Sequence, residues 1–429
     1  MKVAGIIAEF NPFHNGHKYI IDYCKKELCA DYVIIVMSGD FVQRGAPALL
    51  SKFTRARMAL NCGADLVLEL PVYYSLGSAE YFAEGAISIM EGLGVVTDVV
   101  FGSESNDIDL LESITDILVK EPESYKKSLQ KALEEGESFP AARMKGVLAE
   151  AANSSCLLNS NCESVSEVCK IILSSPNSIL GIEYLKALRR CGSSINAHAV
   201  KRIGAEYNST KFNSSDVLPT ASALGIRSFL KSNGLISSHS NTLSDSLSHA
   251  MPKQALMEFS NYNGTFLDGD SFTELLHYKL LLEKNTGFTK YLDVNEDLSN
   301  RIVTNIPEFK TFDQFCQQLK SKNLTYTRIS RCLMHIILNI TEENMLTYKS
   351  AGFSAYGRVL GMRKDASALL SVIHSKTTIP VPPRLKDFEK ELTDIQLKLF
   401  KETLTCSEIY NSISENGIIS EYSLPPVVL

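Results

Sequence analysis

Two histidines near the N-terminus have the residue types and the spacing that chemistry on phosphates requires. His14 and His17 flank Gly16, follow the apolar, strand-like run Val3–Phe10, and stand where a helical pattern begins. The unpaired amide groups and the dipole of a helix N-terminus favour anions, and imidazoles can donate hydrogen bonds to phosphate oxygens. The segment therefore predicts a nucleotide phosphate site. The alternative is a structural turn that carries two solvated histidines.

A metal site is a second reading of the same histidines, because His-x-x-His spacing permits two ligands. No Cys, His or acidic residue follows at the spacing of a third ligand. We therefore predict no metal bound by the protein itself. A magnesium ion carried on the phosphates of ATP is the favoured alternative.

More basic residues follow the next predicted strand. Gln43, Arg44 and Lys52 lie at or before a helix entrance that Ser51 is suited to cap. Lys52 and Arg55 share one face of that helix. These groups are suited to hold phosphates, acetate or the acceptor region of an RNA, and the alternative is a solvated basic helix face.

The elements that must position these residues alternate between strand and helix in the first part of the chain. The predicted strands cover Val3–Phe10, Tyr32–Met37, Asp65–Leu70 and Thr97–Phe101, and helices lie between them at Gly16–Leu28, Ser51–Cys62 and Ser78–Glu91. This order predicts an α/β fold with a parallel sheet covered on both faces. Ligands of such sheets bind at the carboxyl ends of the strands. Asn11–His17, Ser38-Gly39 and Gly102-Ser103-Glu104 are therefore expected at one edge.

The rest of the chain is mainly helical. Predicted helices cover 107–151 (divided at Pro122), 179–190, 271–284, 311–320, 326–340 and 351–360, with a strand at 195–203, a loop at 153–167 and a Ser-rich connection at 232–249. We divide the chain into an ATP-binding catalytic domain, residues 1–235, and a mainly helical domain, residues 236–429.

Composition further limits the class of protein to which the chain can belong. With 429 residues and 45% hydrophobic content, the chain has the make-up of an ordinary globular protein of two domains. No apolar run reaches the roughly 20 residues that span a bilayer, and the N-terminus shows no signal-peptide pattern. Ten cysteines without Cys-x-x-Cys pairs are typical of reduced thiols, so we expect a cytoplasmic protein without a membrane partner. Because the net charge is −6, any RNA contact must come from a local basic patch.

Several longer motifs narrow the interpretation. The His-x-Gly-His word resembles the signature of the nucleotidyltransferase-like superfamily. Residues 37–45 (MSGDFVQRG), 51–53 (SKF), 64–71 (ADLVLELP), 101–104 (FGSE), 176–181 (PNSILG) and 202–203 (RI) follow in order. Together they are similar to the tRNA(Met) cytidine acetate ligase family. The resemblance implies a Rossmann-like, HUP-type nucleotidyltransferase domain.

The resemblance also implies an activity. Acetate and ATP would give acetyl-adenylate, and the N4 amine of the wobble cytidine of elongator tRNA(Met) would then take the acetyl group, without coenzyme A. The implied catalytic residues are His14, His17 and Lys52. The implied ATP-binding residues are Ile7, Ala8, Glu9, Phe10, Asn11, Pro12, Phe13, His14, Asn15, Gly16, His17, Lys18, Tyr19, Ile20, Gly102, Asn177, Arg202 and Ile203.

The second signature of the superfamily is altered in this chain. Residues 222–227 (SALGIR) carry Leu224 where the pattern has Thr, which removes an expected hydroxyl donor, while Arg227 is retained as a phosphate ligand. The alternative for Ser222 is a helix cap. Two rival functions stay open: a small-molecule adenylyltransferase, and a non-catalytic, nucleotide-responsive RNA-binding factor.

A candidate RNA contact lies in the helical part. Arg328, Arg331 and His335 share one helical face, and residues 325–364 hold six Lys or Arg against two Glu. Tyr326 and Tyr348 add stacking surface. We predict tRNA binding by Arg328 and Arg331, with a solvated helix face as the alternative.

Overall fold

Two units make up the part of the chain that the computed structural model describes, which is residues 1–105, 107–153, 162–202, 222–234, 236, 244–353, 356–414 and 420–429. The first unit comprises Met1–Thr97 and Ile203–Leu429, and the second comprises Asp98–Arg202. The predicted division after residue 235 coincides with neither boundary. Segments from both sides of that residue pack together in the first unit, so the functional division stays a prediction.

A mostly parallel sheet forms the centre of the first unit. Its strands run in the order β1 (Val3–Ala8), β2 (Tyr32–Ser38), β5 (Leu66–Leu70), β8 (Arg358–Met362) and β9 (Val427–Val428). β1, β2 and β5 are parallel, while β8 runs antiparallel to β5. Ala8 pairs with Met37 and Ser38 pairs with Leu70, so the carboxyl ends of these three strands share an edge. That part of the prediction is confirmed.

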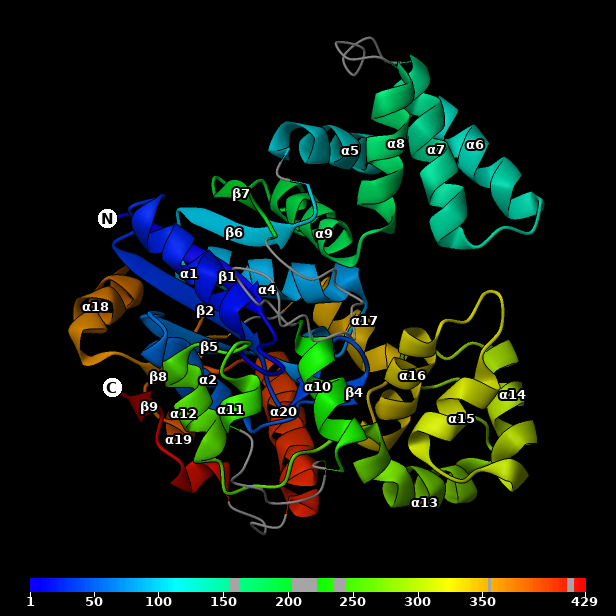
Figure 1. The fold of residues 1–429 in the computed structure, drawn as a ribbon. Coiled ribbons are helices and arrows are strands. Elements are labelled where there is room, and N and C mark those ends of the chain that lie inside the picture. The colour runs from blue at the N-terminus through cyan, green and yellow to red at the C-terminus, as the bar shows by residue number, and fades with distance from the viewer. Residues whose placement is uncertain are drawn as a thin grey trace. The chain divides into compact units, whose positions relative to one another are not determined.

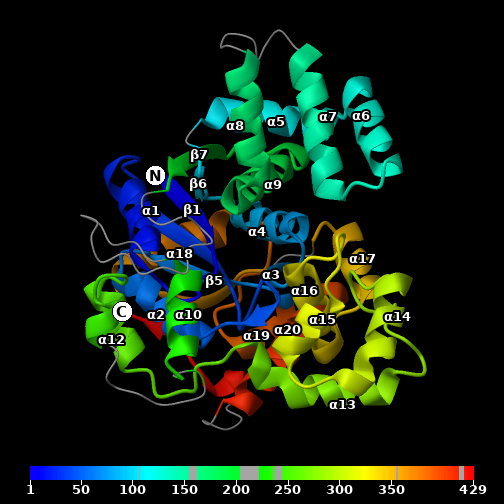
Figure 2. The same cartoon turned by 45° about the vertical axis from the view of Figure 1, so that its right-hand side comes forward.

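Helices surround this sheet (Figure 1). Before residue 98 they are α1 (Asn15–Lys26), α2 (Lys52–Asn61), α3 (Val72–Ser75) and α4 (Ala79–Leu93), and a short hairpin of β3 (Phe41–Val42) and β4 (Ala46–Pro47) precedes α2. After residue 222 they are α10 (Ala223–Ser232), α11 (Ser244–Leu247), α12 (Lys253–Ser260), α13 (Thr273–Glu283), α14 (Glu296–Asn305), α15 (Phe312–Leu319), α16 (Tyr326–Leu338), α17 (Glu342–Ser350), α18 (Ser367–Lys376), α19 (Leu385–Glu391) and α20 (Asp394–Ile413). Helices α13 to α16 form a cluster of their own in both views (Figures 1 and 2).

The prediction of a helix over 351–360 is wrong, because helix α17 ends at Ser350 and residues 351–353 form a turn. Residues from Arg358 onward form strand β8, because Val359 and Leu360 enter the sheet beside β5 and the Arg358 side chain is held by Glu69. The partner strand lies almost 300 residues earlier, and a local pattern cannot reveal such a pairing.

The second unit holds the parallel pair β6 (Asp98–Ser103) and β7 (Asn196–Lys201) with five helices. These are α5 (Ile108–Lys120), α6 (Glu123–Glu134), α7 (Phe139–Asn153), α8 (Cys162–Ser174) and α9 (Pro176–Arg190). Residues 107–153 thus form three helices where two were predicted, and α8 begins inside the predicted loop 153–167. The strand predicted at 195–203 and the helix predicted at 179–190 are confirmed.

Candidate active site

The turn after β1 carries the paired histidines. Strand β1 ends at Ala8, and Phe10 adopts a left-handed backbone with φ 49°, which bends the chain away from the sheet. The Asn11–Pro12 peptide is cis. The buried Asn11 side chain accepts a hydrogen bond from the Leu49 amide at 2.7 Å, so the loop before α2 fixes this turn.

The two imidazoles close the N-terminus of α1. His14 is the N-cap residue, and its Nδ1 accepts the Gly16 amide at 3.0 Å. In return, Nδ1 of His17 accepts the His14 amide at 3.1 Å, and the two rings stack with centroids 3.7 Å apart. A nitrogen that accepts an N–H carries no proton, so each neutral ring holds its proton on Nε2. Each imidazole therefore presents an Nε2–H donor.

Neighbouring residues hold the rings in place. A Cβ atom at Gly16 would lie 2.9 Å from Cε1 of His14, so the glycine provides the space that the cap needs. The ring of Phe10 packs edge-on against His17 at 4.8 Å, and Phe13 lies 5.5 Å from the same imidazole. The glycine of the motif thus makes room for the His14 ring as well as leaving the backbone open to close approach.

The other predicted ATP-binding residues of this segment occupy the same strand, turn and helix. Ile7 and Ala8 end β1, and the Asn15 amide donates to the Ala250 carbonyl at 3.0 Å. Lys18 pairs with Asp22 one turn along α1. The remaining members, Tyr19 and Ile20, lie in the first half of α1, and Tyr19 is exposed.

Glu9 lies at the carboxyl edge of the sheet among basic groups. Its Oε1 accepts the Gln43 amide at 2.7 Å, and Arg44, Arg227 and Arg55 stand near enough to interact with its charge. Burial nevertheless raises the pKa of the Glu9 carboxyl above its ordinary value, and these neighbours only partly offset that effect. The Glu9 carboxylate thus has a backbone amide and basic side chains as partners, which a carboxylate buried at the end of a strand requires.

Lys52 occupies a buried ionic network. Its Nζ lies 2.8 Å from Glu69, 2.6 Å from Glu421 and 3.4 Å from Asp40, and its side chain is 1% exposed. Arg358 completes the network by pairing with Glu69 at 2.6 Å and with Glu421. Ser407 Oγ accepts a further hydrogen bond from Lys52 Nζ at 2.8 Å. The ammonium is thus surrounded by carboxylates, and its predicted contact with substrate stays a prediction.

The electrostatics of the network favour the charged forms of Lys52, Arg358 and Glu421. Burial and the charge of Arg358 lower the pKa of Lys52, but Glu421, Glu69 and Asp40 outweigh them and leave it above the ordinary value. Burial raises the pKa of Glu421, while Lys52 and Arg358 lower it to about 2. Ser407 and Glu421 carry no local sequence signal for this role, because Lys52, the partner that they share, lies more than 350 residues earlier in the chain.

Arg55 is not a solvated basic residue. Its guanidinium is fully buried and donates to the backbone carbonyls of Glu9 at 2.7 Å and of Ser38 and Leu50 at 3.0 Å each. Glu9 follows β1, Ser38 ends β2, and Leu50 lies just before α2. The alternative of an exposed basic face is therefore wrong for Lys52 and Arg55 alike, because both side chains point into the protein.

The second unit brings three predicted ATP-binding residues to one end of its strand pair. Gly102 pairs with Val200 in the β6–β7 ladder, and the Arg202 amide donates to the Ser103 carbonyl at 3.0 Å. The carboxylate of Glu104 accepts hydrogen bonds from Nδ2 of Asn177 at 2.7 Å and from the Ser178 amide at 2.9 Å. Ile203 lies outside the described residues.

Glu104 takes the place of a cap for α9. Ser175, the N-cap residue, makes no side-chain cap bond, whereas Glu104 binds the amide and the hydroxyl of Ser178 in the first turn. Burial raises the pKa of Glu104, but the hydrogen bonds from Asn177 and Ser178 outweigh burial and lower it below the ordinary value. A charged carboxylate at a helix N-terminus stabilises the helix dipole.

Comparison with known proteins agrees with this architecture. The family model described as HIGH Nucleotidyl Transferase matches residues 1–422. A tRNA(Met) cytidine acetate ligase of Clostridium kluyveri is 41% identical over 409 residues, 94% of both chains, and that of Acetivibrio thermocellus is 37% identical over 96% of this chain and 94% of its own. The chain belongs to the tRNA(Met) cytidine acetate ligase family.

Solved structures of this family share the fold. The crystal structure of Thermotoga maritima TmcAL bound with α-thio ATP has a TM-score of 0.86 at 29% identity, and the apo crystal structure has a TM-score of 0.89 at 30% identity. Both comparisons cover 100% of each chain. The prediction of an α/β nucleotidyltransferase fold is thereby confirmed.

The RNA contact predicted for the helical part of the chain needs correction. His335 is fully buried, and its ring nitrogens lie 2.8 Å from the Leu292 carbonyl and 2.9 Å from the Leu76 carbonyl. Tyr348 and Arg358 are buried too, so neither offers a surface to RNA. The local excess of basic residues therefore overstates the surface charge of this region.

Of the basic residues on α16, Arg328 is half-buried, and Arg331 packs more closely. The backbone of Arg331 leaves no space for a side chain at Gly45, which has φ 79°, and burial lowers the pKa of the Arg331 guanidinium. Contact of Arg328 and Arg331 with tRNA stays a prediction.

Four further features bear on the sequence analysis. Ser222 caps α10 by accepting the Gly225 amide at 3.1 Å, which confirms the alternative that we gave for it. The eight cysteines whose side chains the structure describes are free thiols. Within the described residues, no group of three or more His, Cys, Asp or Glu could hold a metal ion, and no helix is long and apolar enough to cross a membrane.

Proposed function

We propose that this chain is an ATP-dependent ligase that makes N4-acetylcytidine at the wobble position of elongator tRNA(Met). Acetate and ATP are its small substrates, and the reaction takes place in the cytoplasm. The observation that carries the proposal is the pair of stacked imidazoles at the start of α1, each with an Nε2–H donor. The names and the ATP analogue of its relatives support the same reading.

In the first step, a carboxylate oxygen of acetate attacks the α-phosphorus of ATP. A new P–O bond forms, the bond to the bridging oxygen of the β-phosphate breaks, and pyrophosphate leaves. His14 and His17 donate hydrogen bonds to the phosphate oxygens, where negative charge builds up during this displacement. A magnesium ion that arrives with ATP neutralises further phosphate charge.

In the second step, the exocyclic amine of the cytidine attacks the acetyl carbon of the adenylate. The C–N bond forms, the bond from acetyl carbon to the AMP oxygen breaks, and the amine loses one proton. The acetyl group is already activated when it meets RNA, so the scheme needs no coenzyme A. From the family resemblance, we further assign contacts with ATP to Gly102, Asn177 and Arg202.

The test supplies the protein with ATP, isotopically labelled acetate and an unmodified elongator tRNA(Met) transcript, then digests the RNA for mass spectrometry. We expect labelled N4-acetylcytidine, and none when ATP is left out. A transcript with uridine at the wobble position is the matched control and should take no label. Unlabelled RNA from a folded protein that binds ATP would overturn the proposal.

A further inference from the structure

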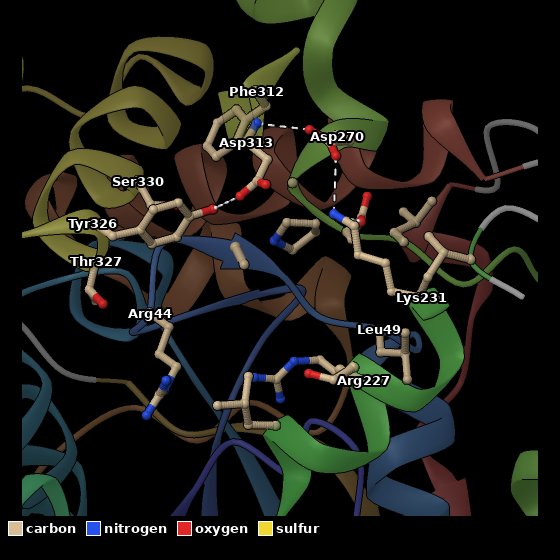
Figure 3. A pocket seen from close by; sticks show the side chains of 18 residues that line it. Arg44, Leu49, Arg227, Lys231, Asp270, Phe312, Asp313, Tyr326, Thr327 and Ser330 are labelled. Atoms are coloured by element: carbon tan, nitrogen blue, oxygen red, sulfur yellow. Dashed lines mark hydrogen bonds and ion pairs between the residues drawn. The ribbon is translucent and has the colours of Figure 1, made fainter. Parts of the chain in front are cut away.

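A pocket of about 310 Å³ lies in the first unit beside the residues that follow β1 (Figure 3). Five segments line it: the β3–β4 hairpin with the residues after it, helix α10, residues 267–270, the start of α15 and the start of α16. Its volume is at the lower end of the roughly 300–1,000 Å³ typical of small-molecule sites. The pocket therefore suits one nucleotide better than an extended ligand.

The two ends of this pocket differ in charge. At one end, Lys231 pairs with Asp268 and Asp270 at 3.1 Å each, and Asp270 also accepts the Asp313 amide at 2.8 Å. The charges at this end are thus compensated by neighbours on the protein itself. At the other end lie the guanidinium groups of Arg44 and Arg227 (Figure 3), and both interact with the charge of the Glu9 carboxylate. Guanidinium groups match the geometry of phosphate oxygens.

An aromatic ring forms one wall between these ends. The Tyr326 hydroxyl donates to Asp313 at 2.6 Å, which fixes the orientation of the ring (Figure 3). Pro47, Leu49 and Leu224 add apolar surface. A fixed aromatic face beside cationic groups is the arrangement by which proteins hold single, unstacked nucleotides of RNA.

Arg227 connects the pocket to the paired histidines. Its Nη1 donates to the backbone carbonyl of Asn11, in the turn that leads to His14. A ligand at the arginine end therefore lies next to the segment that we assign to phosphate chemistry. This is where the second substrate of a transfer reaction must enter.

We propose that this pocket receives the acceptor nucleotide of the RNA, with its base against Tyr326 and its phosphate at Arg44 and Arg227. The assignment rests on the proposed function, because it identifies where the acetyl acceptor binds. Acetate is far smaller than the pocket. ATP or its adenine ring is the competing occupant, and the experiment distinguishes it.

The test compares two rates in each variant: acetate-dependent exchange of pyrophosphate into ATP without RNA, and acetyl transfer over a series of tRNA(Met) concentrations. For Tyr326→Ala, the ratio of transfer kcat/KM to exchange rate should fall about 10- to 100-fold, as expected for the loss of one stacked base. Arg44→Met should lower the same ratio through a higher KM for tRNA. It also keeps the test decisive if Tyr326→Ala fails to fold.

Two control variants separate the contribution of the Tyr326 ring from other effects of a substitution. Tyr326→Phe keeps the aromatic face and should restore most of the ratio. Tyr278→Ala removes a ring that is 64% exposed on α13 and should leave the ratio unchanged.

Each of the other possible results would overturn either the pocket assignment alone or the proposed function as well. An unchanged ratio in folded Tyr326→Ala and Arg44→Met, with active wild-type protein, would overturn the pocket assignment alone. Exchange and transfer falling together would place ATP or acetate in the pocket and also overturn it. No transfer by the wild type would overturn the proposed function and this assignment with it.

Discussion

The imidazole pair at the start of α1 and the buried network around Lys52 offer a direct comparison. Both lie near the carboxyl ends of the parallel strands, and both carry residues that the sequence predicts to be catalytic. His14 and His17 use Nδ1 to accept backbone amides, so the proton of each ring is on Nε2. Lys52 instead directs its ammonium at three carboxylates and a hydroxyl.

The difference shows how partners decide the role of a charged or polar residue. An imidazole that accepts a backbone amide at Nδ1 carries its proton on Nε2, the atom that we propose donates to phosphate. An ammonium enclosed by carboxylates stabilises the fold, because it neutralises charges that would otherwise be buried alone. The predictions below test whether these two centres are as different as their contacts indicate.

The largest expected effect is on stability. Lys52→Met leaves Asp40, Glu69 and Glu421 with only part of their compensating charge, which should lower the free energy of unfolding by about 3–5 kcal/mol. Urea denaturation measures this change in the free energy of unfolding. Arg57→Met is the matched control, because the Arg57 side chain is 45% exposed and such a surface pair with Glu258 is worth roughly 0–1 kcal/mol. If folded Lys52→Met keeps wild-type stability but loses pyrophosphate exchange, Lys52 acts on substrate and the comparison fails.

Acid should weaken the same network. The folded-state pKa of Glu421, about 2, lies below its ordinary value of 4.5, so its contribution is complete above about pH 4.5 and is lost as the pH falls towards 2. That contribution is on the order of 3 kcal/mol. Denaturation between pH 5.5 and 3.5 should show a shallower loss for Glu421→Gln than for the wild type. Equal slopes would contradict the charge assignment.

At Gly16 we expect a smaller loss of stability and a larger loss of pyrophosphate-exchange activity. The added Cβ of Gly16→Ala would meet the His14 ring, displacing the cap at a cost of about 1 kcal/mol of stability. Misplacing a catalytic donor by an ångström can slow a reaction by about 10²-fold, so pyrophosphate exchange should fall by that order. Wild-type exchange in this variant would show that ring position is unimportant.

The smallest effect concerns RNA. Arg328→Ala should weaken tRNA binding and reduce the slope of log affinity against log salt by about 1, because one phosphate contact is lost. Arg384→Ala, at the N-cap of α19, is the control, since that exposed arginine already pairs with Asp387. Identical salt slopes for the two variants would remove Arg328 from the tRNA interface.

Much of the fold could be predicted from local pattern. The strands Val3–Ala8, Tyr32–Ser38 and Leu66–Leu70 agree with prediction to within two residues, because a parallel sheet buried on both faces needs continuous apolar runs. Strand β8 could not be found this way. Its place depends on pairing with β5 and on the ion pair of Arg358 with Glu69.

The same distinction between local pattern and long-range contact applies to the site. The histidine motif is local, so its spacing alone indicated a helix start with two polar rings. The partners of Lys52 are distributed over the whole chain, and spacing could not reveal that they enclose it. For His335, helical periodicity placed it correctly beside Arg328 and Arg331, but only the packing of α16 shows that its ring is buried.

The most direct test of the account measures acetate-dependent pyrophosphate exchange in His14→Asn and His17→Ala. Asn at position 14 can still cap α1, so it separates the imidazole's chemistry from its stabilising bond. Each variant should fold and lose roughly 10²- to 10³-fold in exchange rate, the usual loss for one oriented donor. Folded variants that exchange at the wild-type rate would contradict the claim that these imidazoles stabilise the phosphates.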